Sequence, residues 1–143
     1  MLFTKKKVVK RPSNKTLGNV TESYIVMAFS KLGYWAKLMP MDFGGQPCDI
    51  VAIRNNKNVL CDAKNVEHGD SFSFHRIEPN QANCFKLATH NNGIVNCGFV
   101  IFFKDYQVLK WLPYHIVETA TENGVNSIKV DSLEDFSKFI KEI

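Results

Sequence analysis

The sequence lacks several features that define common classes of protein. No run approaches 18 consecutive apolar residues, so we expect no transmembrane helix. Residues 1–15 contain no apolar core followed by a small-residue cleavage site, so we expect no secretory signal and a cytoplasmic location. No glycine-rich phosphate loop follows a predicted strand, so no nucleotide cofactor is expected.

Cysteine pairs at metal-binding or redox spacing are also missing. The four cysteines, Cys48, Cys61, Cys84 and Cys97, form no C-x-x-C pair. Without an export signal, free thiols are expected. The spacing of these cysteines and of the four histidines matches no zinc template, so structural zinc is not expected.

Acidic residues are absent from residues 1–16. This segment holds six basic side chains, Lys5, Lys6, Lys7, Lys10, Arg11 and Lys15. The whole chain has 18 basic and 14 acidic residues, so the remainder is slightly acidic. A cationic tail on such a domain suits a polyanionic partner, either nucleic acid or an anionic membrane; the alternative is a solvated tail that only aids solubility. The membrane ranks last, because no basic amphipathic helix or lipidation signal is present.

The chain has 143 residues, of which 45% are hydrophobic, and this suits one globular domain. We therefore expect a flexible basic tail at 1–16 and a single domain at 17–143. Apolar periodicity and turn residues predict helices at 17–32, 78–90, 114–122 and 133–143, the last with a capping box at Asp131 and Glu134. They predict strands at 34–43, 49–53, 59–64, 99–103, 106–112 and 127–130. This order predicts an α/β fold, a mixed central sheet flanked by helices.

Two aspartates and a lysine lie on the predicted hairpin. Asp49 opens one strand and Asp62 lies in the next, with a turn-rich Asn55–Asn58 segment midway between them. Positions equidistant from a turn oppose each other, so the two carboxylates meet at one end of the sheet. Side-chain alternation puts Lys64 on the same face as Asp62.

Two adjacent carboxylates repel each other, and a divalent cation relieves that repulsion. Oxygen ligands suit Mg²⁺, with Mn²⁺ also acceptable, and the backbone carbonyl of Ala63 adds a further oxygen. Such a metal activates water and polarises a phosphodiester, while Lys64 orients that water or offsets charge on the phosphate. The alternative is structural: Asp62 and Lys64 form a surface ion pair, and Asp49 caps a turn.

The order of these residues resembles the PD-(D/E)xK nuclease signature, and in particular the RecU-like and archaeal Holliday junction resolvases. The resemblance covers about Leu17 to Val117. Its parts are Gly18 with Glu22, Cys48-Asp49, Cys61-Asp62-Ala63-Lys64-Asn65, Ser71-Phe72-Ser73-Phe74, Asn80-Gln81, Phe99–Phe103 and Tyr106–Leu109.

The resemblance implies a restriction-endonuclease-like core and a Mg²⁺-dependent endonuclease that resolves four-way DNA junctions by paired nicks. It implies that Glu22, Asp49 and Asp62 bind one or two metal ions, that Lys64 is catalytic and that Gln81 supports the site. It also implies 5′-phosphate and 3′-hydroxyl products, a homodimer with two active sites, and a tail that embraces DNA. The stretch from Gly33 to Asp49 is too short for the stalk of cellular RecU proteins, and such a compact form suits a phage or mobile-element enzyme in DNA recombination and repair.

Further residues have two interpretations each. Lys37, His75 and Arg76 lie near the motif, where they contact DNA phosphates or are solvated. Trp35 and Trp111 are interpreted as core or dimer-interface residues and not as base-stacking platforms. Phe72 and Phe74 suggest an edge strand that pairs with a partner, or a wedge that enters a junction.

Two other functions remain open. One is a restriction- or repair-type nuclease that acts on other DNA. The other is a DNA-binding module that has the fold without catalysis.

Overall fold

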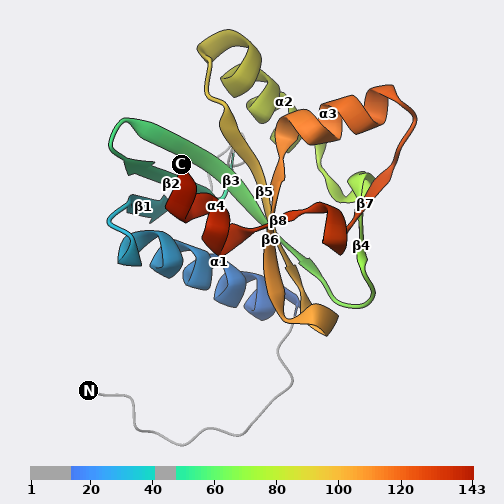
Figure 1. Ribbon diagram of the computed structural model, residues 1–143, viewed down its shortest axis with the longest axis horizontal. Coiled ribbons are helices and arrows are strands. Elements are labelled where there is room, and N and C mark those ends of the chain that lie inside the picture. The colour runs from blue at the N-terminus through green and yellow to red at the C-terminus, as the bar shows by residue number, and fades with distance from the viewer. Residues whose placement is uncertain (1–13, 41–47) are drawn as a thin grey trace, which may run out of the picture.

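A six-stranded mixed sheet forms the centre of the protein (Figure 1). The computed structural model describes residues 14–40 and 48–143. The strands occur in the order β1 (Trp35–Leu38), β2 (Ile50–Arg54), β3 (Lys57–Val66), β5 (Asn96–Phe103), β6 (Val108–Pro113) and β8 (Glu134–Asp135). Only β3 and β5 pair in parallel within this sheet of the described residues; every other neighbouring pair is antiparallel.

Helices cover both faces of the sheet, as predicted. Figure 1 shows α1 (Asn14–Lys31) on one side and α2 (Pro79–Lys86) and α3 (Tyr114–Glu122) on the other. The short α4 (Phe136–Glu142) shares the core of α1. Two short strands, β4 (Ser71–Ser73) and β7 (Ser127–Lys129), make a separate two-stranded sheet. Single turns η1 (Phe74–Arg76), η2 (Leu87–Asn91), η3 (Lys104–Tyr106) and η4 (Val130–Ser132) connect these elements.

Strand β5 separates two hydrophobic cores. Phe99, Ile101 and Phe103 are fully buried in the core that includes residues of α2 and α3. Val100 points the other way and is fully buried with residues of α1 and α4. A strand covered on both faces needs apolar residues at successive positions, and this explains the unbroken apolar run of β5.

The β2–β3 hairpin is closed by two asparagines. Arg54 pairs with Lys57, so the turn consists of Asn55 and Asn56 alone. Both have positive φ, 49° and 66°. Two consecutive left-handed residues form the type I′ turn, whose twist matches that of paired strands, and asparagine tolerates this conformation. The predicted hairpin is confirmed, with a turn two residues shorter than expected.

Arg54 of β2 makes hydrogen bonds to backbone carbonyl groups at the C-terminal ends of α1 and α4. Its guanidinium donates hydrogen bonds to the carbonyl oxygens of Leu32, Ile140 and Ile143 at 2.9, 3.4 and 3.3 Å. It also lies 4.3 Å from the ring centroid of Tyr34. These contacts satisfy carbonyl groups at the ends of α1 and α4, which helices leave without partners.

Several element boundaries differ from the sequence prediction. The first helix begins at Asn14, because a polar first turn leaves no apolar period to detect. The strand predicted at 34–43 ends at Leu38, two residues before Pro40, which has no N–H to donate. The second helix starts at Pro79, and its last part, Leu87–Asn91, is a π-helical turn.

The predicted capping box at Asp131 and Glu134 is wrong. Asp131 lies in the turn η4, and Glu134 lies in β8 paired with Trp111. The structure instead has a capping box on α2, formed by Glu78 and Gln81. Local spacing alone cannot distinguish a cap from a strand residue, because pairing with β6 decides it.

Two aromatic predictions also need correction. Phe72 is fully buried, so its side chain cannot act as a wedge. Its strand β4 pairs along one edge with β7 of the same chain. Trp111 is 3% exposed, as a core residue should be, whereas Trp35 is 61% exposed and is therefore not a core residue; its place in a dimer interface stays a prediction. Trp35 lies on β1, which is an edge strand of the sheet that the described residues form.

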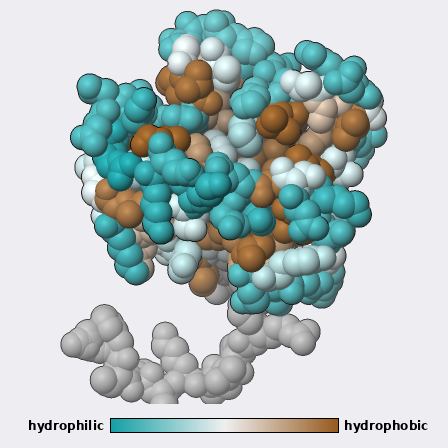
Figure 2. All heavy atoms as spheres, in the orientation of Figure 1, coloured by the Kyte–Doolittle hydropathy of each residue, from teal (hydrophilic) through white to brown (hydrophobic). Residues whose placement is uncertain are grey.

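The surface is mixed in character. Figure 2 shows a mainly hydrophilic face whose apolar side chains form several separate clusters. Within the described residues, no helix combines the length and apolar character needed to cross a membrane.

Gly98 provides a test of the packing between β5 and β6. It pairs with Pro113, and an added Cβ would overlap the carbonyl oxygen of Leu112 and lie 2.9 Å from the Cα of Pro113. We expect Gly98→Ala to lower the free energy of unfolding by about 3 kcal/mol or more, because backbone must shift. Gly93→Ala is the control: its Cβ meets open space at φ +68°, so it should cost about 1 kcal/mol. Urea denaturation measures both, and equal losses would contradict the predicted clash.

Candidate active site

Two hydrogen bonds from backbone N–H groups hold the carboxylates of Asp49 and Asp62 at the open end of the hairpin. The Asp49 backbone N–H donates to Asp62 Oδ1 at 2.8 Å, and the Ala63 N–H donates to Asp49 Oδ2 at 2.9 Å. Ile50 pairs with Cys61, so the next positions along the two strands bring Asp49 opposite Asp62. The two carboxylates therefore meet as the hairpin spacing predicts.

The Lys64 ammonium lies beside this pair. Its Nζ is 3.9 Å from Asp62 Oδ2 and donates a hydrogen bond to Gln81 Oε1 at 3.1 Å. The same Oε1 accepts the Glu78 N–H at 3.2 Å. Gln81 therefore joins the N-terminus of α2 to the lysine, and this positions the lysine against the carboxylates. The structure thus brings Asp49, Asp62, Lys64 and Gln81 together.

Glu22 reaches the cluster from α1. It precedes the fully buried Ile25 and Phe29 by three and seven residues, so it lies on the helix side that faces the sheet. Burial raises the pKa of Glu22, and the Glu22 carboxyl group lies near enough to Asp49 for the charge of that carboxylate to raise the pKa further. The structure therefore adds the predicted helix glutamate to the cluster.

Thr21 and Asn65 are two site-supporting residues that the sequence interpretation did not identify. Thr21 Oγ1 donates to Asn65 Oδ1 at 2.8 Å, which ties α1 to β3 next to Glu22 and Lys64. The Asn65 carbonyl accepts a hydrogen bond from Arg76. The only local signal was the polar Asn65 directly after Lys64, because Thr21 is 44 residues away in sequence.

Burial and mutual repulsion perturb two of these carboxyl groups. Burial, followed by the charge of Asp49 and a hydrogen bond to it, raises the pKa of Glu22 to about 7. Burial, followed by the Asp49 charge, raises the pKa of Asp62 to about 7, against the opposing effect of Lys64. Opposing carboxylates in a poorly solvated place favour neutralisation by a proton or a cation.

The donor set fits a hard divalent cation. Asp62 is 1% exposed, and its Oδ2 finds no hydrogen-bond donor among the residues that the structure describes. The Lys64 ammonium is 3.9 Å from this oxygen but makes no hydrogen bond to it, and a buried carboxylate oxygen without a donor is costly unless a closer ion occupies the place. Across residues 14–40 and 48–143, no three His, Cys, Asp or Glu side chains form a preassembled metal cage, so the fit depends on the orphaned oxygen.

The predicted DNA-contact residues lie at different places. Lys37 is exposed on β1, and His75 is exposed in η1. The Arg76 guanidinium bonds to the Asn65 carbonyl and lies 5.6 Å from the Phe72 ring centroid, so it supports the site structurally. Lys15 lies in the first turn of α1. The remaining tail cations, Lys5, Lys6, Lys7, Lys10 and Arg11, lie outside the described residues.

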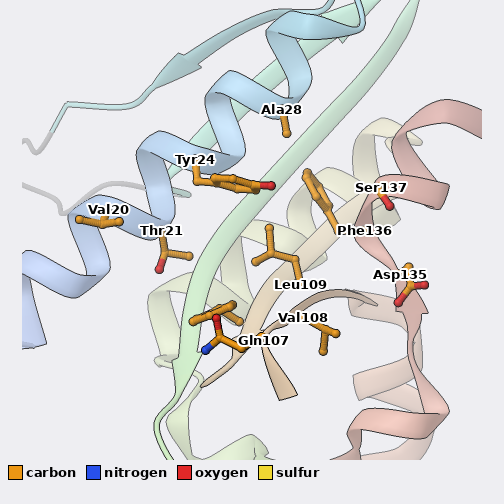
Figure 3. Close-up of a pocket in the computed structure, with 11 residues that line it drawn as sticks. Val20, Thr21, Tyr24, Ala28, Gln107, Val108, Leu109, Asp135, Phe136 and Ser137 are labelled. Carbon is orange, nitrogen blue, oxygen red and sulfur yellow. The ribbon is translucent and has the colours of Figure 1, made fainter. Parts of the chain in front are cut away.

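A separate groove of about 600 Å³ lies between α1, β6 and the start of α4. Figure 3 shows Tyr24 of α1 pointing across it toward Phe136 and Leu109, with Asp135 and Ser137 on the far side. Among the described residues that line the groove, Asp135 is the one with a carboxylate, and it pairs with Lys110 at 2.8 Å. With a single carboxylate already paired, the groove lacks the acid–lysine chemistry of the Asp49–Asp62 cluster.

The metal-free stability of an Asp62 variant tests this description. Because the folded pKa of Asp62 is raised, its ionised form destabilises the fold fully above pH 7, and the penalty is relieved as pH falls toward 4. We expect Asp62→Asn to raise the free energy of unfolding at pH 8 in EDTA by an amount on the order of 1–3 kcal/mol. The gain should shrink at pH 5.

The control for this prediction is Asp135→Asn, which removes a carboxylate that is 60% exposed. Its effect should stay within about 0.5 kcal/mol at both pH values. A less stable Asp62→Asn protein at pH 8 would contradict the predicted carboxylate penalty. Urea denaturation at the two pH values measures all three proteins.

Comparison with known proteins identifies the fold. No protein-family profile matches the chain, and no curated protein matches its sequence. The Holliday junction resolvase Hjc of the archaeal hyperthermophile Archaeoglobus fulgidus is similar in structure, with TM-score 0.61 and 12% identity over 89% of this chain and 98% of that chain. The bacterial homing endonuclease I-Ssp6803I has TM-score 0.54 and 12% identity over 82% and 78%. Both have restriction-endonuclease-like folds, and this chain has that fold too, as predicted.

Proposed function

We propose that the protein is a metal-dependent endodeoxyribonuclease that resolves four-way DNA junctions. One observation carries the proposal: the buried Asp62 carboxylate, with one oxygen lacking a donor, opposes Asp49 and adjoins Lys64. A carboxylate with a purely structural role is seldom left without a donor, whereas carboxylates in hydrolytic active sites often are. The similarity to a Holliday junction resolvase supports the junction as substrate.

Asp49, Asp62 and Glu22 would hold Mg²⁺, or Mn²⁺, with the Ala63 carbonyl as a further oxygen. Bound there, the ion would lower the pKa of a water and polarise the phosphodiester. Water oxygen forms the new bond to phosphorus, the bond from phosphorus to the 3′ oxygen breaks, and that oxygen gains a proton. Lys64, held by Gln81, offsets negative charge on the phosphate or orients the attacking water.

DNA contacts would come from exposed cations around this cluster. Lys37 lies on the same sheet face as Asp62, and the six tail cations supply further phosphate contacts. His75 is exposed in η1, beside Arg76, which bonds to the backbone of β3.

The principal alternative is a nuclease that cuts linear duplex DNA at a defined sequence. The structural similarity to a homing endonuclease favours this alternative. A four-way junction compared with a matched linear duplex separates the two functions.

We also propose a homodimer, formed through an exposed apolar stripe on α1. Val20, Tyr24 and Met27 are 59, 62 and 54% exposed at helical spacing. Val20 and Tyr24 also line the groove of Figure 3, so the apolar stripe and the groove lie next to each other on one face. An apolar stripe next to an apolar groove is typical of an interaction surface. A two-fold axis would allow the stripe of each copy to contact the groove of the other copy.

Cleavage assays test the active site. We expect Lys64→Ala and Asp62→Asn to lower cleavage of a labelled four-way junction with Mg²⁺ on the order of 100-fold or more, since transition-state charge loses its partner. The control is Lys57→Ala, which removes an exposed cation from the other end of β3 and should cleave normally. Full activity in either site variant would refute the assignment. Paired nicks in the junction alone, lost in EDTA, support resolution; equal cutting of duplex supports the alternative.

Sedimentation measures the proposed dimer. We expect the wild-type protein to sediment as a dimer and Tyr24→Lys as a monomer, because a charge would be buried in an apolar contact. Tyr106→Lys is the control, since Tyr106 is 48% exposed but does not line the groove. A Tyr24→Lys protein that remains dimeric would exclude this face.

A further inference from the structure

Two large apolar side chains stand exposed on the sheet face that carries the acidic cluster. Trp35 is 61% exposed and Ile53 is 40% exposed. The register pairs them directly across β1 and β2, so their side chains lie on the same face. The hydrophobic cores account for neither residue, because neither belongs to a core cluster of the described residues. An exposed aromatic and aliphatic pair beside a candidate active site suggests a ligand contact.

The register connects this pair to the carboxylates in three rows. Positions two apart along a strand share a face. The rows on this face are Trp35–Ile53–Asn58, then Lys37–Val51–Leu60, and finally Asp49–Asp62. The last row lies four residue steps along the strand from the first, a distance of roughly 13 Å at about 3.3 Å per step. A DNA strand bound at the acidic row therefore has its neighbouring nucleotides within reach of Trp35.

The charge along this path suits a polyanion. No acidic residue occurs in β1, β2 or the first half of β3, Lys57–Cys61. Lys37 stands in the middle row, exposed, between Trp35 and the carboxylates. A phosphate placed beside Lys37 would have its adjoining nucleotides directed toward Trp35 on one side and the acidic cluster on the other.

We propose that this face binds a nucleic-acid strand, with an unpaired base stacked on the Trp35 indole and its phosphate beside Lys37; the proposal rests on the proposed nuclease function. An indole stacks on any base, because every base has a π face. Bases inside a duplex are already stacked on each other, so only unpaired nucleotides gain from this contact. The contact selects branched or single-stranded DNA through residues that take no part in hydrolysis.

The chain contains a built-in reporter for this contact. It has two tryptophans, and the other, Trp111, is 3% exposed and stacks on Phe139 at 4.2 Å between ring centroids. Iodide quenching of the full-length protein therefore isolates the Trp35 emission. The experiment adds a single-stranded oligo-dT in EDTA, and separately a blunt duplex of equal length. The single strand should quench the iodide-accessible emission and shield it from iodide, whereas the duplex should not.

Matched variants separate stacking from apolar bulk. By anisotropy of labelled oligo-dT, Trp35→Leu should bind about tenfold more weakly than wild type, and Trp35→Phe should stay within about threefold. Lys37→Gln should weaken binding and lower the slope of log affinity against log salt by about one. Equal affinities for Trp35→Leu and wild type, or equal quenching by duplex, would overturn the proposal. Trp35 emission that changes with protein concentration in the absence of DNA would identify a self-association face and also overturn it.

Cleavage with Mg²⁺, measured separately, distinguishes this site from the proposed function. If junctions are cut but the single strand does not change the Trp35 emission, the proposed stacking site is wrong and the proposed nuclease function is supported. If the single strand quenches the Trp35 emission but no DNA is cut, the stacking site is supported and the proposed nuclease function is wrong.

Discussion

The register of the β2–β3 hairpin is the constraint on which the candidate site depends. A two-residue turn of Asn55 and Asn56, both in the left-handed conformation, sets that register. A slip of one residue would turn every side chain of one strand to the opposite face. With the observed register, Asp49 opposes Asp62, and Asp62, Lys64 and Lys37 share one face.

The arrangement carries a cost that function explains better than stability does. Asp62 is almost completely buried beside another carboxylate, and one of its oxygens lacks a donor among the described residues. Backbone N–H groups hold the two carboxylates in place, and Gln81 of α2 holds Lys64 beside them. The Thr21–Asn65 hydrogen bond ties α1 to β3 next to this cluster. Rigid elements that hold unfavourable charges together are typical of hydrolytic sites.

The two faces of the central sheet carry different features. One face holds the acidic cluster, α2 and the exposed row that begins at Trp35. The other holds α1, α4 and the apolar groove. Helix α1 connects the two, because it carries Glu22 toward Asp49 while its outer stripe lies beside the groove. A dimer through that stripe would leave the Trp35 row of the opposite face available to DNA.

The sequence by itself determined the hairpin, the meeting of Asp49 with Asp62, the place of Lys64 and the mixed α/β sheet, since turn chemistry and side-chain alternation act over a few residues. Its resemblance to junction resolvases pointed to Glu22 and Gln81. Only the tertiary structure decided that Gln81 bonds to Lys64, that Asn65 holds Thr21, that Trp35 is exposed and that Phe72 is buried. These features depend on which helix or strand covers which face, and contacts between residues far apart in the chain leave no local pattern to read.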